Sequence, residues 1–109
     1  MSKEFTLAAA LALILWGTAL PASAAGTAED VFLKKCSVCH GPDGAGKTAR
    51  GKKLKLRDLR SPEVQKLTDT LLNEITAKGK GKEMPGYEKE LDKDTIQQIV
   101  AFLRQLDKK

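Results

Sequence analysis

The sequence predicts a small all-α fold of three or four helices joined by long loops. Near the C-terminus, apolar residues recur at helical spacing, at Ile96, Ile99, Val100, Leu103 and Leu106. A shorter apolar stripe over residues 71–75 lies between a capping threonine and Gly79. No convincing strand surrounds the two cysteines of the chain. Together these patterns favour helices over a sheet.

The N-terminal segment is expected to lie outside the fold. A short basic start, Met1 to Lys3, is followed by an apolar run over residues 5–20 and by the small residues 22–24. That order is typical of a secretory signal peptide. The alternative is an uncleaved anchor, but a spanning helix needs about 20 apolar residues. We therefore expect residues 1–24 to be cleaved and residues 25–109 to form one domain, exported to a bacterial periplasm.

The expected mature chain has too few large side chains for a substantial core. Its aromatic residues are Phe32, Tyr87 and Phe102, and its net charge remains +5 because Lys3 and Glu4 leave together. Domains this small usually need a disulfide, a metal or a large cofactor for stability. The composition therefore predicts such an addition.

Four helices follow in order along the mature chain. The first is expected over residues 28–39 with Thr27 as its cap, and the second from Pro62 to about Lys66 after Ser61. The third is expected over residues 69–78, between Thr68 and Gly79. The last begins after Asp92, where Leu91 and Ile96 can form a hydrophobic staple. A basic stretch over residues 47–60 is expected to turn its three leucines, Leu54, Leu56 and Leu59, inward.

The two cysteines, Cys36 and Cys39, allow four interpretations. A disulfide between them closes a tiny loop and stabilises little. A structural zinc site needs four ligands, and His40 is the only histidine. A thioredoxin-like pair needs a βαβ context. The fourth is covalent haem attachment, for which residues 36–40 have the C-x-x-C-H spacing.

The spacing suits haem attachment for a chemical reason. Each thiol adds to one porphyrin vinyl group to form a thioether, and two intervening residues separate Cys36 and Cys39 to match the two vinyls. The next residue, His40, then lies under the ring, where its imidazole can bind iron. Because no other cysteine is present, we expect one covalent haem c.

An iron bound by one histidine needs a second axial ligand, because otherwise small molecules can bind to it. Met84 is the only methionine after residue 24, and its thioether sulfur is a soft ligand that favours ferrous iron. Pro85 restricts the backbone before it, as a rigid ligand-bearing loop requires. The alternative is that Met84 fills the core, which is common for methionine. Nearby lysines can replace it at high pH, namely Lys78, Lys80 and Lys82.

Two segments resemble the class I cytochromes c. They are residues 36–41, with Phe32 four positions earlier, and residues 82–87, which read KEMPGY. The similarity is greatest to small bacterial monohaem carriers of the cytochrome c6-like kind. It implies a cytochrome c fold around one haem, with His40 and Met84 as axial ligands and Phe102 where the last helix crosses the first.

The chain departs from the family at two positions. Ala28 stands where the family usually has a glycine at the crossing of the first and last helices. Gly51 is followed by Lys52 where the family commonly has a proline, whose carbonyl accepts a hydrogen bond from the proximal imidazole. Another carbonyl is expected to take that role. Arg50, Arg57 and Tyr87 are the candidate partners of the haem propionates.

The function implied is a monomeric, soluble carrier of single electrons in a respiratory or photosynthetic chain, not an enzyme. Iron with both axial positions filled has no site for a substrate. Lysines in the segments expected around the haem predict a redox partner with an acidic surface; they are Lys34, Lys35, Lys47, Lys52, Lys53, Lys78, Lys80 and Lys82. The alternative is that these lysines form solvated faces that only keep the protein soluble. Nucleic-acid binding is disfavoured because only Tyr87 offers a ring for stacking among them. The rivals are a ligand-binding sensor or peroxidase-like enzyme, and a tethered subunit of a respiratory complex.

Overall fold

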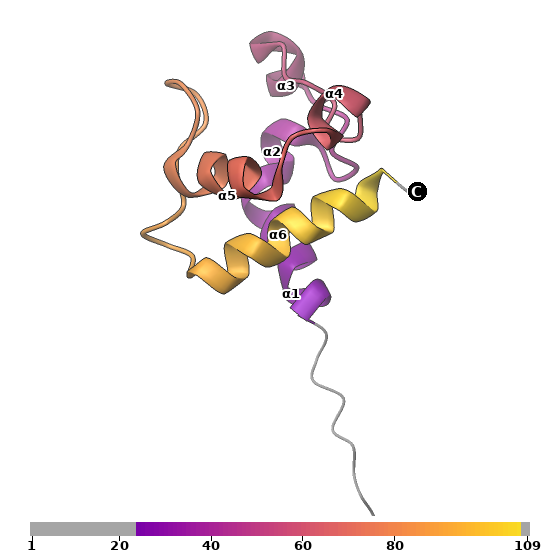
Figure 1. Ribbon diagram of the computed structural model, residues 1–109. Helices are drawn as coiled ribbons and strands as arrows, with labels where there is room; N and C mark the ends of the chain where they lie inside the picture. Colours follow the sequence, from indigo (N-terminus) through magenta and orange to yellow (C-terminus); the bar gives the residue numbers. More distant parts are fainter. Residues whose placement is uncertain (1–23, 108–109) are drawn as a thin grey trace, which may run out of the picture.

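A computed structural model describes residues 24–107. Figure 1 shows α6 lying across the helices formed by the first part of the chain, with α5 to one side and α3 and α4 above. The helical segments are α1 (Ala24–Val31), the π-helical turn η1 (Phe32–Cys36), α2 (Ser37–His40), α3 (Ala49–Leu54), α4 (Pro62–Gln65), α5 (Asp69–Lys78) and α6 (Lys93–Leu106). Residues 24–107 contain no strand beyond an isolated antiparallel bridge between Lys80 and Met84. The all-α prediction is confirmed.

The first helix is longer than predicted and changes its winding. α1, η1 and α2 follow one another without a break from Ala24 to His40. The expected cap at Thr27 is wrong, because the helix already includes this residue and the alanines before it favour helix. The predicted signal peptide falls almost wholly outside the described residues. The π-helical turn includes Cys36, the first of the two cysteines, and such turns are frequent at functional sites.

The main core forms where α6 packs against α1 and η1. The rings of Phe32 and Phe102 lie 5.2 Å apart between centroids at an interplanar angle of 57°. Ala28 is fully buried in the same cluster, with Ile99 and Leu103 beside it. The predicted crossing at Phe102 is therefore confirmed, and the alanine at position 28 is accommodated at the helix contact.

A second cluster joins α4 and α5 to α6 through Val64, Leu72 and Val100. Polar contacts reinforce it: the Gln65 side chain donates to the Leu103 carbonyl at 3.1 Å. Arg104 Nη1 donates to the Gln65 carbonyl at 2.7 Å. The short helix α4 is thus fixed to the final helix by hydrogen bonds as well as by apolar contacts.

The caps predicted for the later helices are present. Side chains of Ser61, Thr68 and Asp92 accept hydrogen bonds from the first turns of α4, α5 and α6. The basic stretch differs from prediction, since part of it forms α3 with Thr48 as its cap. This added helix makes five helical segments in residues 24–107, counting α1 to α2 as one. Leu59 packs against both core clusters.

No helix within residues 24–107 is long and apolar enough to cross a membrane.

Candidate functional site

The cysteines and the histidine lie on one continuous helical surface. Cys36 ends η1, and Cys39 and His40 form the end of α2. All three side chains are half-buried, and both cysteines are free. Burial raises the pKa of the Cys36 thiol to about 11, so this thiol is neutral near pH 7. Two free thiols beside one imidazole suit thioether formation.

His40 has the chemistry of an iron ligand. Burial lowers the pKa of its imidazole, so the ring is neutral and keeps a lone pair for a metal. Its Nδ1 is buried and has no hydrogen-bond partner among the described residues. The carbonyls of Gly51 and Lys52 accept from the Lys55 amide where α3 ends, and neither accepts from His40. A half-buried imidazole without a protein partner fits metal binding.

α3 packs against the backbone of the cysteine motif through Gly51. A Cβ atom at this position would lie 2.3 Å from the Gly46 carbonyl oxygen and 2.6 Å from that of Cys39. The Thr48 hydroxyl donates to the Cys39 carbonyl at 2.7 Å and accepts from the Gly51 amide at 2.8 Å. The Gly46 amide donates to the His40 carbonyl at 2.7 Å. The His40 side of the site is therefore fixed by direct backbone contact.

Met84 lies on a loop that leaves the end of α5 and returns to it; residues 79–88 are called the Met84 arm below. Two backbone hydrogen bonds join the two sides of the arm. The Lys80 amide donates to the Met84 carbonyl at 3.0 Å, and the Met84 amide donates to the Lys80 carbonyl at 3.3 Å. Two glycines allow close approach at its base. A Cβ atom on Gly79 would lie 2.5 Å from the Met84 carbonyl oxygen, and one on Gly86 would lie 2.5 Å from that of Ala77.

The C-terminal end of the arm, with Glu90 just after it, contacts the helix that carries the cysteines. The Tyr87 hydroxyl donates to the Lys35 carbonyl at 3.4 Å. The Lys35 ammonium donates to the Glu90 carboxylate at 2.9 Å. Burial raises the pKa of Tyr87, and the nearby thiols of Cys36 and Cys39 add to this shift. The fold thus brings the segment that carries Met84 beside the cysteine pair.

A cavity of about 410 Å³ separates α3 from the Met84 arm. Arg50, Lys53 and Leu54 line it from α3, and Glu83 lines it from the arm. A haem bound by His40 and Met84 would need space between these two elements. Arg50, one of the three candidate propionate partners, faces this space, whereas Tyr87 contacts Lys35.

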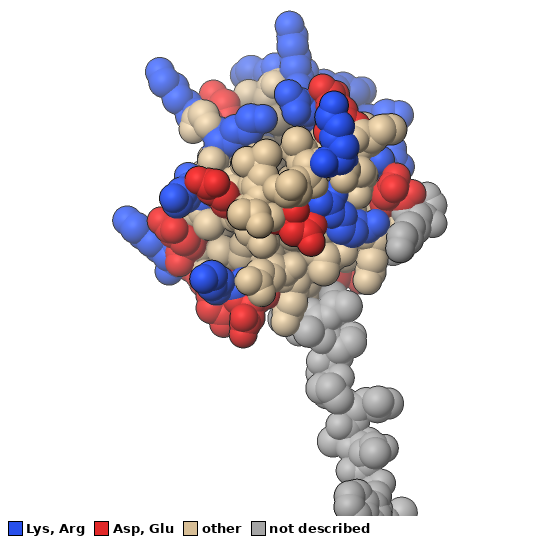
Figure 2. Space-filling view, in the orientation of Figure 1, with Lys and Arg blue, Asp and Glu red and all other residues tan. Residues whose placement is uncertain are grey.

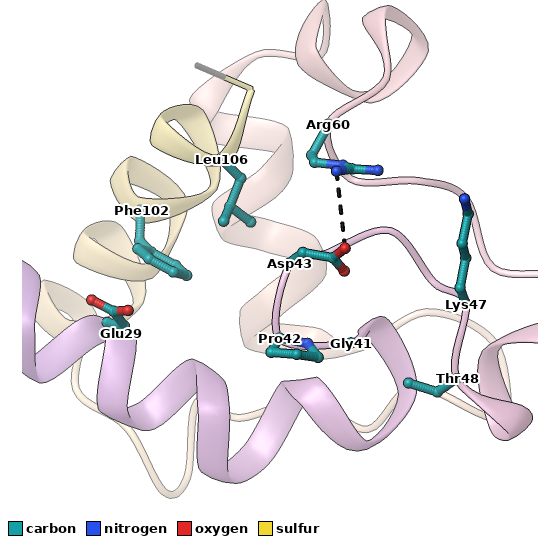
Figure 3. Close-up of a pocket in the computed structure, with 9 residues that line it drawn as sticks. All are labelled: Glu29, Gly41, Pro42, Asp43, Lys47, Thr48, Arg60, Phe102 and Leu106. Atoms are coloured by element: carbon teal, nitrogen blue, oxygen red, sulfur yellow. Dashed lines mark ion pairs between the residues drawn. The ribbon is translucent and has the colours of Figure 1, made fainter. Parts of the chain in front are cut away.

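Another cavity, of about 490 Å³, has a different lining, and neither cavity is lined by Cys36, Cys39, His40 or Met84. Figure 3 shows it between α1, α6 and the turn that begins at Gly41, with Phe102 and Leu106 on the helical side. Asp43 and Arg60 face each other across it at 3.9 Å. Its lining holds both acidic and basic groups, among them the exposed residues Glu29, Asp43 and Lys47.

The charges are divided between two regions of the surface. Figure 2 shows basic side chains gathered over the part where α3 lies, and acidic ones around the opposite lower side. The basic lobe, as we call it, consists of six exposed residues that form no ion pair among the described residues: Lys47, Arg50, Lys52, Lys53, Lys55 and Arg57. Lys35 and Lys78 are instead paired with Glu90 and Glu74.

Several supporting residues escaped the sequence analysis. Thr48 is a residue type that favours the start of a helix, and its side chain accepts from the amide of Gly51 three positions later. The basic residues around it made the segment resemble a loop, so the helix was not predicted. Gly86 looked like part of the methionine motif, whereas its role is to let the arm approach α5. No pattern indicated that Tyr87 and Glu90 contact Lys35, because these contacts join distant parts of the sequence.

Known proteins with this arrangement identify the family. Residues 23–103 match the family described as cytochrome c oxidase, cbb3-type, subunit III. The chain belongs to this family of c-type cytochromes. Among solved structures, the KustC0563 c-type cytochrome is similar, with a TM-score of 0.67 and 26% identity. The match covers 72% of this chain and 95% of that one. No curated protein matches the sequence.

Membership confirms the resemblance seen in the two sequence segments and implies a covalently bound haem c that transfers electrons. The site of this c-type cytochrome fits such a group. It offers two free thiols and a half-buried, neutral imidazole whose Nδ1 has no protein partner, and a cavity lies near them between α3 and the Met84 arm.

Proposed function

We propose that this c-type cytochrome carries one haem and shuttles single electrons between redox proteins. Cys36 and Cys39 would form the thioethers, and His40 and Met84 would bind the iron. When bound, the haem supplies the Fe(III)/Fe(II) couple. The protein is a carrier and not an enzyme, because both axial positions are taken by its own side chains.

One observation supports this proposal most strongly. The segment that carries Met84 is closed by backbone hydrogen bonds and reaches across to the helix that carries the cysteines. A methionine that merely fills the core needs no such support, and Met84 is not fully buried. A ligand-bearing arm has to be held in place, and this one is.

The residues of the site have separate tasks in this proposal. The neutral His40 imidazole donates its lone pair, and the Met84 sulfur favours the ferrous state and raises the potential. Leu54 and Ile75, both half-buried, exclude water from the space beside α3 and α5. Ligands that stay the same in both oxidation states keep the reorganisation energy small.

The basic lobe supports a partner with an acidic surface. Unpaired cations on one side of a carrier speed its encounter with an oppositely charged protein. Of the lysines expected to serve this purpose, Lys35 and Lys78 are engaged within the chain, so the lobe around α3 is the better candidate. We place the protein in the periplasm as a monomer, with no nucleic-acid partner and no stable membrane insertion.

The family description supports a second candidate. Its members are described as a subunit of a cbb3-type cytochrome c oxidase. If residues 5–20 are retained as an anchor, this chain delivers electrons within such a complex and does not diffuse between partners. Mass spectrometry of the haem-loaded protein distinguishes the two, because a carrier begins near Ala25 and a tethered subunit keeps residues 1–24.

Visible spectra of the haem-loaded protein test the ligands. We expect the ferric protein to show the weak far-red band of an iron–thioether bond, and the ferrous protein to bind no carbon monoxide. Met84→Ala should lose the band and bind carbon monoxide at once. Glu88→Ala, a change at an exposed arm residue that lines neither cavity, is the control and should behave as the wild type. A wild type without the band that binds carbon monoxide would favour the sensor or peroxidase-like function.

A further inference from the structure

The Met84 arm and the turn that follows it, residues 79–91, are joined to the cysteine-bearing helix by two side-chain contacts. Among the hydrogen bonds of the described residues, these are the ones that link residues 79–91 to η1 and α2: Tyr87 to the Lys35 carbonyl at 3.4 Å, and the Lys35 ammonium to Glu90 at 2.9 Å. Both involve Lys35, the residue directly before Cys36. We call these contacts the Lys35 clamp.

The rest of the arm has no comparable link to that helix. Its base is held to α5, where the amides of Tyr87 and Glu88 donate to the carbonyls of Thr76 and Ala77 at 3.0 Å each. Its tip is exposed, and a Cβ atom on Gly81 would have nothing within 4 Å. The tip can therefore move about this base, and the clamp, whose Tyr87 belongs to the base, fixes the base against the cysteine-bearing helix.

The charged part of the clamp is stable across the neutral pH range. Its hydrogen bond to Glu90 raises the pKa of Lys35, so the ammonium stays charged. The Tyr87 side chain is half-buried, although its hydrogen bond to the Lys35 carbonyl is itself exposed to solvent. A loop tip held only by its own backbone would open more often.

We propose that Tyr87, Lys35 and Glu90 are positioning residues that keep the Met84 arm closed and so set how readily an outside ligand replaces Met84. This rests on the proposed function, in which Met84 is an axial ligand. The clamp joins the covalent attachment to the arm, so that the two halves of the site move together. None of the three residues contacts the iron in this proposal.

Imidazole binding to the ferric, haem-loaded protein measures arm opening, because imidazole can bind only when Met84 has left. In Tyr87→Phe/Glu90→Gln we expect the apparent association constant to rise about 3- to 30-fold, as befits the loss of one hydrogen bond and one exposed ion pair. The far-red band should persist without imidazole, since the arm is still closed most of the time.

Amide hydrogen exchange gives a second readout that does not use the iron. The amides of Lys80 and Met84, which pair within the arm, should exchange faster in the double variant. Amides in the middle of α6 should be unchanged. A merely structural role would instead raise exchange throughout the protein and lower the midpoint of urea unfolding.

A matched control removes an ion pair of similar exposure elsewhere. Lys78 and Glu74 lie 3.8 Å apart on α5 and do not join the arm to η1. Glu74→Gln should leave imidazole affinity unchanged. The charge-swapped variant Lys35→Glu/Glu90→Lys keeps a pair of opposite charges. Its association constant for imidazole should therefore lie closer to that of the wild type than the constant of the single variant Glu90→Gln does.

The outcomes separate failure of the clamp from failure of the proposed function. If the wild type has the far-red band and the double variant binds imidazole no more tightly, the clamp proposal is wrong and Met84 ligation stands. If the wild type itself lacks the band and binds imidazole freely, Met84 is not the ligand and both proposals fall. An equal rise in Glu74→Gln would also overturn the clamp.

Discussion

The His40 side and the Met84 side of the site are held in different ways. On the His40 side, α3 meets the cysteine motif backbone to backbone, with no room for a side chain at Gly51. On the Met84 side, an exposed arm is closed by a few hydrogen bonds and reaches the helix only through the Lys35 clamp. The His40 side is therefore held by close packing, and the Met84 side by a small number of hydrogen bonds.

This difference indicates which part of the site can move. Close packing transmits any added volume to the whole fold, so changes on the His40 side should cost global stability. Hydrogen bonds of a surface loop break and re-form separately from the core, so changes on the Met84 side should alter ligation with little effect on unfolding. The predictions below test this division.

The largest effect is expected for Gly51→Ala. The added methyl group would overlap the carbonyl oxygens of Gly46 and Cys39, so either α3 or the cysteine motif must shift. We expect the free energy of unfolding to fall by about 2 kcal/mol or more, within the range for overpacked sites. Urea unfolding of the haem-loaded protein, followed by circular dichroism, measures it.

Gly81→Asn is the control for this substitution. Gly81 has a φ of +62°, which asparagine tolerates, and open space around its Cα. The change in stability should stay below about 0.5 kcal/mol. If both variants lose the same stability, the contact at Gly51 is not what holds α3, and the proposed difference between the two sides disappears.

Gly86→Ala should damage the Met84 side locally. Its Cβ atom would lie 2.5 Å from the Ala77 carbonyl oxygen, at the base of the arm. Because the arm can move outward, we expect the far-red band to weaken or vanish while the free energy of unfolding falls by only about 1 kcal/mol. Visible spectra and urea unfolding on one sample compare the two. A large global loss with the band intact would contradict this expectation.

The charges on the two sides predict a kinetic difference. Lys52→Glu/Lys53→Glu in the basic lobe should slow electron exchange with the anionic complex hexacyanoferrate by about 10-fold at low salt, with the difference shrinking as salt is added. Lys89→Glu/Lys93→Glu makes the same change in net charge on the acidic side. Stopped-flow rates that fall equally in both variants would show that only net charge matters.

The sequence was most informative where local chemistry determines structure. Ser61, Thr68 and Asp92 cap the helices they were expected to cap, and the stripe after Asp92 forms the buried face of α6. Local patterns did not reveal α3, because alternating basic residues and leucines resemble a loop over the haem. The contacts of Gly51 and Tyr87 were also hidden, since each depends on a segment brought near only by folding.

The smallest effect is expected at Asp92, where the segment after the Met84 arm enters α6. Its side chain accepts from the Thr95 amide at 2.8 Å, and this contact lowers the pKa of the carboxyl below its usual 3.8. A lowered pKa in the folded state means that the stabilisation is present above the unfolded value and is lost as pH falls through the folded one. Asp92→Asn keeps a capping side chain but cannot titrate.

The wild type should therefore lose its advantage over Asp92→Asn below about pH 4. Thermal unfolding of both proteins between pH 7 and pH 2 measures this, with the wild type slightly more stable at pH 7 because a charged cap also interacts with the positive end of the helix. If the far-red band fades over the same pH range in the wild type alone, the start of α6 also supports the arm. If the unfolding temperatures of the two proteins instead differ by the same amount at every pH, titration of Asp92 does not contribute to acid unfolding. The Lys35 clamp would then remain the contact that joins the two sides of the site.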